Sequence, residues 1–191
     1  MAAPSPKDAI GRLLGFAGSR KKLAVLGCVL AGVNGVFVVM PLVCVWFVLR
    51  DLVAVAPNWS AAEGLAFWGW LAFAFSAAGL FVYFAALMCT HLAAFRTAAN
   101  MRKQALGHLA RVPLGYFDSH ASGHLRRVVD GCAAETEGLL AHKLPDTAGS
   151  VAMIAGMLVL FFAFDWRLGL ACLAPVVLSL CCMFYMMGGR G

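Results

Sequence analysis

Charged residues are scarce in this chain. They make up 13% of its 191 residues, about half of the roughly 25% found in soluble domains, whereas hydrophobic residues make up 62%. This composition excludes a soluble globular protein. The length allows a single domain, and a bundle of a few membrane helices would use all of it.

Motifs for several kinds of site are also missing. No Gly-Lys dipeptide occurs, so the phosphate-binding loop G-x-x-x-x-G-K-[ST] is absent, and no two cysteines have CxxC spacing. His120 and His124 have a spacing that zinc ligands on a helix often have, but Gly123 lies between them and no carboxylate base accompanies them. We therefore predict no catalytic, cofactor or metal site, and no ATP hydrolysis by these residues.

Four stretches free of Asp, Glu, Lys and Arg are long enough to cross a bilayer, which requires about 20 apolar residues. They cover residues 23–49, 64–95, 147–164 and 168–189. The last two are separated only by Asp165, Trp166 and Arg167, which predicts a tight helical hairpin. Before the first span, apolar residues recur at helical spacing over 7–18, which predicts a short elbow helix in the membrane interface. The expected fold is an all-α membrane protein with four long transmembrane helices.

The positive charges predict the orientation of these spans. All Lys and Arg residues except Arg50 and Arg167 precede the first span, lie between the second and third, or follow the fourth. Because Lys and Arg are retained on the cytoplasmic side, we expect both termini to be cytoplasmic. The basic clusters are interpreted as topology signals, and no nucleic-acid binding is expected.

The segment between the second and third spans has helical periodicity of its own. The pattern of the second span continues to Arg111, where Pro113 and Gly115 stop it, and a new pattern leads from Leu125 into the third span. We therefore expect one helix over 64–111 and another over 125–164, followed by the fourth over 168–189. The first two form a cytoplasmic excursion that ends in a turn.

This turn carries a recognisable motif. Residues 112–123 read V-P-L-G-Y-F-D-S-H-A-S-G, and residues 124–130 read H-L-R-R-V-V-D. The run resembles the first intracellular loop of ABC transporters with the exporter-type (type IV) fold, in which a P-x-x-[FY]-F/Y-D turn precedes S-G-x-L-x-R-x-x-x-D. The segments L-A-H-K-L-P-D at 140–146 and D-W-R-L-G-L at 165–170 look more particularly like bacterial half-transporters, in which a membrane domain precedes an ATPase domain.

The resemblance implies that residues 117–125 form the first coupling helix, which docks against a nucleotide-binding domain. Asp118 would cap this short helix, and Ser122 with Gly123 would start the next one. The residues implied in partner contact are Tyr116, Phe117, Asp118, His120, Ser122, Gly123 and Leu125.

The function implied by the resemblance is the transmembrane portion of an ATP-driven transporter in a bacterial inner membrane. Its partners would be membrane lipids, a nucleotide-binding domain that holds ATP and Mg, and a homo- or heterodimeric half-transporter. Such proteins continue through two further spans into an ATPase domain, so we expect this chain to be part of one, with that domain absent. The alternative is a small independent membrane protein that scaffolds or regulates a partner.

One polar residue in the first span is a further candidate. Asn34 lies among apolar residues, and polar groups within a membrane tend to face the bundle interior. We interpret it as part of a substrate pathway or as the donor of a helix–helix hydrogen bond.

Overall fold

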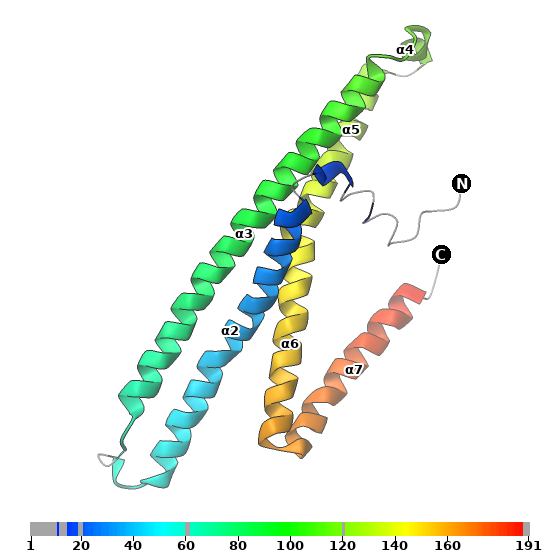
Figure 1. Ribbon diagram of the computed structural model, residues 1–191. Coiled ribbons are helices and arrows are strands. Elements are labelled where there is room, and N and C mark those ends of the chain that lie inside the picture. Colours follow the sequence, from blue (N-terminus) through cyan, green and yellow to red (C-terminus); the bar gives the residue numbers. More distant parts are fainter. Residues whose placement is uncertain (1–10, 12–14, 19–20, 60–61, 120, 189–191) are drawn as a thin grey trace. The chain divides into compact units, whose positions relative to one another are not determined.

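The structure, a computed structural model, describes residues 11, 15–18, 21–59, 62–119 and 121–188 (Figure 1). Its elements are α2 (Lys21–Ala54), α3 (Leu65–Leu109), α4 (Gly115–Ser119), α5 (Ser122–Gly138), the π-helical segment η3 (Leu139–Lys143), α6 (Leu144–Phe164) and α7 (Trp166–Gly188). The described residues contain no strand, and the predicted all-α fold is confirmed.

Four helical stretches are long and apolar enough to cross a membrane: Lys21–Ala54, Leu65–Leu109, Ser122–Phe164 and Trp166–Met186. They contain the four charge-free stretches of the sequence, apart from end residues of the second and fourth. The second and third are much longer than the roughly 20 residues that a span requires. Most of the predicted elbow helix over 7–18 lies outside the described residues. Within it, residues 15–17 are helical, and the Phe16 carbonyl accepts a hydrogen bond from Asn100 Nδ2 at 3.1 Å.

The hairpin between α6 and α7 is held by a short side-chain cap. Asp165 Oδ1 accepts a hydrogen bond from the backbone N–H of Arg167 at 2.8 Å, and the Asp165 carbonyl accepts one from Gly169 at 2.9 Å. This is the N-cap arrangement that satisfies a free N–H in the first turn of a helix. Gly169 itself allows the close approach, because a Cβ there would lie 2.6 Å from the Phe162 ring.

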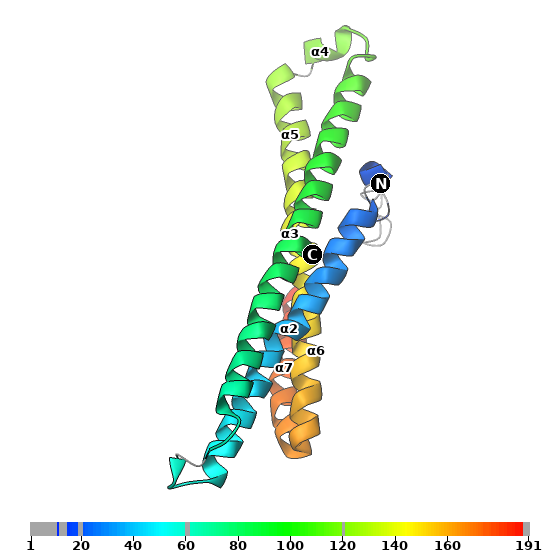
Figure 2. The ribbon, with the colours of Figure 1, turned by 60° about the vertical axis from the view of Figure 1, so that its left-hand side comes forward.

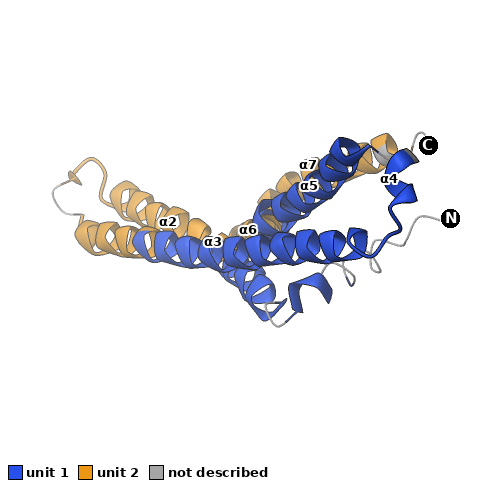
Figure 3. Ribbon diagram, turned by 90° about the horizontal axis from the view of Figure 1, so that it is seen from above, with its two compact units in different colours: residues 1–34, 77–149 blue, residues 35–76, 150–191 orange. Residues whose placement is uncertain are grey.

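The chain divides into two compact units, shown in separate colours in Figure 3. Unit 1 comprises residues 1–34 and 77–149, and unit 2 comprises residues 35–76 and 150–191. The long helices pass from one unit to the other, so each unit contains parts of several helices.

Unit 1 is held together by small residues. Its buried side chains are nearly all alanine or threonine: Ala17, Ala24, Ala31, Ala86, Thr90, Ala93, Ala94, Thr97, Ala98, Ala133, Thr136, Leu140, Ala141 and Pro145. Gly27 on α2 faces Ala86 and Thr90 on α3, and a Cβ at Gly149 on α6 would lie 3.2 Å from the Ala31 carbonyl oxygen. Small residues of this kind let membrane helices approach closely and gain van der Waals contact.

Unit 2 packs through aromatic rings instead. Phe47 and Trp68 stack with centroids 4.3 Å apart and an interplanar angle of 6°, and Trp46 lies 4.5 Å from Phe164. The guanidinium of Arg50 lies 4.8 Å from the centroid of the Phe47 ring, a distance at which cations are attracted to aromatic faces. Aromatic residues therefore join α2 to both α3 and α6 in this unit.

The π-helical segment η3 is followed by a proline at position 145, near the start of α6. In an α-helix the N–H of residue 145 would bond to the carbonyl of Ala141, but Pro145 has no N–H. Thr90 Oγ1 on α3 lies 3.3 Å from the Ala141 carbonyl oxygen and 3.1 Å from the Leu87 carbonyl oxygen of its own helix, so its one proton is shared between these two acceptors. Beside this bond, the rings of His91 and His142 meet edge to face with centroids 4.9 Å apart. The proline thus frees a carbonyl that joins the third span to α3.

Candidate functional site

The turn after α3 is closed by its own backbone. The N–H of Ala110 donates to the Leu106 carbonyl at 2.9 Å, and the N–H of Val112 donates to the Leu109 carbonyl at 3.2 Å. Pro113 follows, and because it has no N–H and fixes its own φ, it prevents continuation of the helix. Helix α3 therefore ends before this proline, as predicted.

Helix α4 is a single turn that lies across the end of α3 and α5. The N–H groups of Tyr116 and Phe117 donate to the carbonyls of Pro113 and Leu114 at 3.0 and 2.9 Å. Figures 1 and 2 both show α3 and α5 side by side, with α4 connecting their far ends. We call residues 112–125 the tip.

Three apolar side chains are exposed at the tip. Leu114 is 86% exposed, and Tyr116 and Phe117 are each 36% exposed. The two aromatic rings meet edge to face with centroids 5.8 Å apart, an arrangement favoured by their quadrupoles. The sequence reasoning overlooked Leu114. The available signal was its position between Pro113 and Gly115, where a turn cannot bury a large side chain.

A mainly apolar groove of about 660 Å³ lies between α3 and α5 at the tip. It is lined by Arg102, Leu106, Leu109, Ala110, Val112, Leu114, Phe117, Ser122, Leu125, Arg126, Val129 and Asp130. Phe117 and Leu125 both line this groove. Volumes of this size are typical of pockets that bind other molecules.

Asp130 joins the two helices beside the groove. Its Oδ1 lies 3.5 Å from Arg102 Nε on α3, and its Oδ2 lies 3.5 Å from Arg126 Nε one turn earlier on α5. All three side chains are well exposed, so each pair contributes at most about 1 kcal/mol. The pairs therefore orient the arginines at the groove more than they stabilise the fold. The pair with Arg126 lies within α5, and the pair with Arg102 joins α5 to α3.

Several details of the predicted coupling segment are corrected. Residues 117–125 do not form one helix, because α4 ends at Ser119 and α5 begins at Ser122. Asp118 lies within α4 and so does not occupy its N-cap position. The N-cap of α5 is Ala121, which makes no side-chain cap hydrogen bond. Its carbonyl instead accepts the N–H groups of His124 and Leu125 at 2.9 and 3.2 Å.

Gly123 does not act as a left-handed hinge. The positive-φ glycines among the described residues are Gly18 and Gly64, whereas Gly123 is in the first turn of α5 with open space around it. Ser122 and Gly123 are exposed, and Leu125 is half-buried. His120 lies outside the described residues.

Asn34 is separate from this site. It is half-buried in α2, and none of the groove-lining residues comes from that helix.

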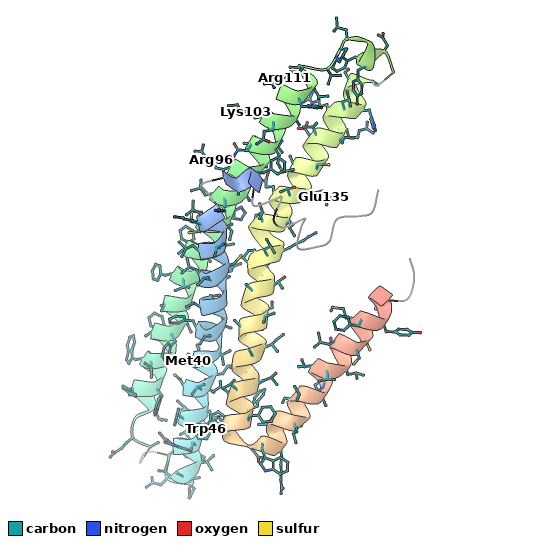
Figure 4. All side chains as sticks on the ribbon, turned by 45° about the vertical axis from the view of Figure 1, so that its right-hand side comes forward. Met40, Trp46, Arg96, Lys103, Arg111 and Glu135 are labelled. Carbon is teal, nitrogen blue, oxygen red and sulfur yellow. The ribbon has the colours of Figure 1, made fainter. Side chains whose placement is uncertain are left out.

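Basic side chains follow α3 toward the tip, with Arg96, Lys103 and Arg111 in succession (Figure 4). The described residues contain no group of three His, Cys, Asp or Glu side chains placed to hold a metal ion.

Comparison with known proteins gives one family match. The family model described as the ABC transporter transmembrane region matches residues 23–189. The mycobactin import ATP-binding/permease protein of Mycobacterium tuberculosis is 29% identical over 94% of this chain and 22% of its own length. The protein of that name from Mycolicibacterium smegmatis is 27% identical over 83% of this chain and 18% of its own length. The ATP-dependent lipid A-core flippase of Coxiella burnetii is 29% identical over 57% of this chain and 19% of its own length. The chain thus spans less than a quarter of the length of these relatives.

Proposed function

We propose that this chain, which belongs to the family of ABC transporter transmembrane regions, forms part of the substrate pathway of an ATP-driven transporter and docks its tip against a nucleotide-binding domain. Family membership favours this interpretation over an independent scaffold or regulator. The match extends across all four spans, so it concerns the membrane region as a whole.

The exposed apolar tip is the observation that carries the docking proposal. Leu114, Tyr116 and Phe117 lie at the end of a helix pair that continues beyond the second charge-free stretch, which ends at Phe95. At 1.5 Å per residue, the helix from Arg96 to Leu109 extends about 20 Å further. Lipid does not cover side chains so far from the hydrocarbon, and a cluster of exposed apolar side chains in water indicates a partner surface.

The partner's chemistry follows from the relatives and from the groove. Two of the relatives are named ATP-binding/permease proteins, so the proposed surface belongs to a nucleotide-binding domain, with ATP and Mg held there. The groove offers apolar walls with Arg102, Arg126 and Asp130 at one side, and the net positive charge of these three side chains suits a partner surface that presents an apolar side chain next to an acidic one.

The proposed setting is a bacterial inner membrane with the N-terminus and the tip in the cytoplasm, because Lys and Arg are concentrated there. A second half-transporter, identical or different, would complete the substrate pathway. Asn34 is proposed to face this pathway. The names of the relatives differ in cargo, from mycobactin to lipid A-core. The proposal therefore assigns no cargo.

The test is a comparison of exposed apolar residues in the complete transporter. Phe117→Ala and Leu114→Ala should leave expression and membrane insertion unchanged, because insertion depends on the spans. Both should weaken the functional interaction with the nucleotide-binding domain, since a central interface residue contributes about 2 kcal/mol or more, equivalent to roughly 30-fold in affinity. The measurement is the stimulation of ATPase activity by transported cargo.

Val128→Ala is the matched control. Val128 is 48% exposed on α5 but does not line the groove, so its truncation should leave the stimulation unchanged. Full stimulation in both tip variants would contradict docking through this surface.

A further inference from the structure

A second groove lies in unit 1, at the N-terminal end of α2. One part, of about 420 Å³, is lined by Lys21, Lys22, Val25, Leu26 and Val29. The other, of about 370 Å³, is lined by Ala24, Val25, Cys28, Val29, Leu140, Leu144 and Ala148. Both parts include Val25 and Val29, so they lie next to each other on α2, and the second part lies between α2 and the face of η3 and α6. We call the two parts together the lysine groove.

The lysine groove is charged at one end and apolar along the rest. Lys21 and Lys22 are exposed at its entrance, and none of the lining residues is acidic. Directly after them begins the charge-free stretch that ends at Leu49. The lysines are therefore at the membrane surface, where ammonium groups attract anionic headgroups, and the apolar part lies in the hydrocarbon.

The length of the groove corresponds to one leaflet. Beside the lining residue Ala148, α6 lies close against α2, because a Cβ at Gly149 would be 3.2 Å from the Ala31 carbonyl oxygen. From Lys21 to Ala31 a helix rises about 15 Å. This is half of the roughly 30 Å hydrocarbon thickness, so the groove matches one acyl chain and not a spanning helix.

We propose that the lysine groove binds an anionic phospholipid, with its phosphate at Lys21 and Lys22 and one acyl chain against Val25, Val29 and Leu144. The observations exclude two simpler occupants. A free phosphate would leave the apolar walls uncovered, and a zwitterionic lipid would gain little from two adjacent cations. Lipid binding at this site requires only that α2 is in a membrane. The proposal therefore does not depend on coupling to a nucleotide-binding domain.

The test uses the full chain reconstituted in phosphatidylcholine vesicles that contain a small fraction of a photoactivatable lipid. The lipid is either phosphatidylglycerol or phosphatidylcholine, with the reactive group in the middle of an acyl chain. After irradiation, mass spectrometry measures labelling of the peptides that contain Val25 and Leu144. Phosphatidylglycerol should label them roughly 30-fold more than phosphatidylcholine, the preference expected from two lysines near the surface.

Charge variants test the role of the entrance. The double variant Lys21→Gln with Lys22→Gln should reduce the labelling by phosphatidylglycerol to the level of phosphatidylcholine, and replacing both lysines with arginine should preserve the preference. The matched control is Arg111→Gln with Arg127→Gln, which removes two exposed cations near the tip and should have no effect.

A groove-filling variant tests the acyl chain without changing charge. Ala148→Phe should reduce labelling by both lipids at these peptides, whereas Val151→Phe, at a position 62% exposed on α6, should not. Equal labelling by the two lipids in the unmodified chain would overturn the proposal, as would no labelling at these peptides. Competition by millimolar inorganic phosphate would also overturn it, because it would identify a free-anion site.

Discussion

The contact between Gly27 and α3 should be sensitive to a single methyl group. A Cβ at Gly27 would collide with the Cγ2 methyl of Thr90 and would lie 3.2 Å from the Ala86 carbonyl oxygen. The methyl cannot rotate away freely, because Thr90 Oγ1 is hydrogen-bonded to the Ala141 carbonyl on η3. Gly27→Ala must therefore separate the helices or break that bond. Overpacking of a tight contact costs about 1–3 kcal/mol, and we expect Gly27→Ala to destabilise the chain by this amount.

Two further variants separate this effect from the general effect of removing a glycine. Gly69 lies in α3 with open space around its would-be Cβ, so Gly69→Ala should be neutral or stabilising by up to about 1 kcal/mol, as alanine is in helices. Thr90→Ser removes the colliding methyl but keeps the hydroxyl. Combined with Gly27→Ala, it should recover part of the lost stability, and the two nearby backbone atoms account for the remainder.

The assay is unfolding of the purified chain in mixed micelles as the proportion of a denaturing detergent rises, followed by the circular dichroism of the helices. The free energies of unfolding of the four variants form a double-mutant cycle with an independent control. The reasoning is refuted if Gly27→Ala and Gly69→Ala have equal effects, or if Thr90→Ser fails to relieve the cost of Gly27→Ala.

Three other outcomes are expected. Thr90→Val removes the donor to the Ala141 carbonyl and should cost about 1 kcal/mol in the same unfolding assay, whereas Thr90→Ser should not. Asp165→Ala should cost about 0.5–2 kcal/mol through loss of the helix cap, with Asp165→Asn nearly neutral, and an equal loss in both would argue against capping. In a chain without native cysteines, a cysteine at Ala56 should react with an impermeant reagent from outside intact cells and one at Ser119 should not, and the reverse pattern would overturn the orientation.

The candidate site was partly predictable. Pro113 and Gly115 predicted the end of the helix, and the motif from Val112 to Asp130 implied that the turn contacts a partner, which stays a prediction. The start of the next helix at Ser122 is confirmed. The assignment of a cap to Asp118 was wrong, because Asp118 lies inside α4. At the start of α5, the Ala121 carbonyl accepts the backbone hydrogen bonds and no side chain caps the helix. The exposure of Leu114 depends on how α4 lies across the ends of α3 and α5, which sequence spacing does not specify.

The sequence by itself determined that this chain is a bundle of four long membrane-compatible helices, because scarcity of charge over twenty residues or more is a local property that leaves few alternatives in a bilayer. Only the tertiary structure decided which small residues meet. Gly27 is one of 20 glycines, and nothing in its immediate neighbours marks it as the contact with Thr90. Likewise, Pro145 predicts that the Ala141 carbonyl has no partner within its own helix. The sequence does not predict that Thr90, 51 positions away, supplies a hydrogen-bond donor to it. Membrane helices are apolar on every side, so their packing depends on shape and on a few hydrogen bonds, and the pattern of hydrophobic residues carries little information about either.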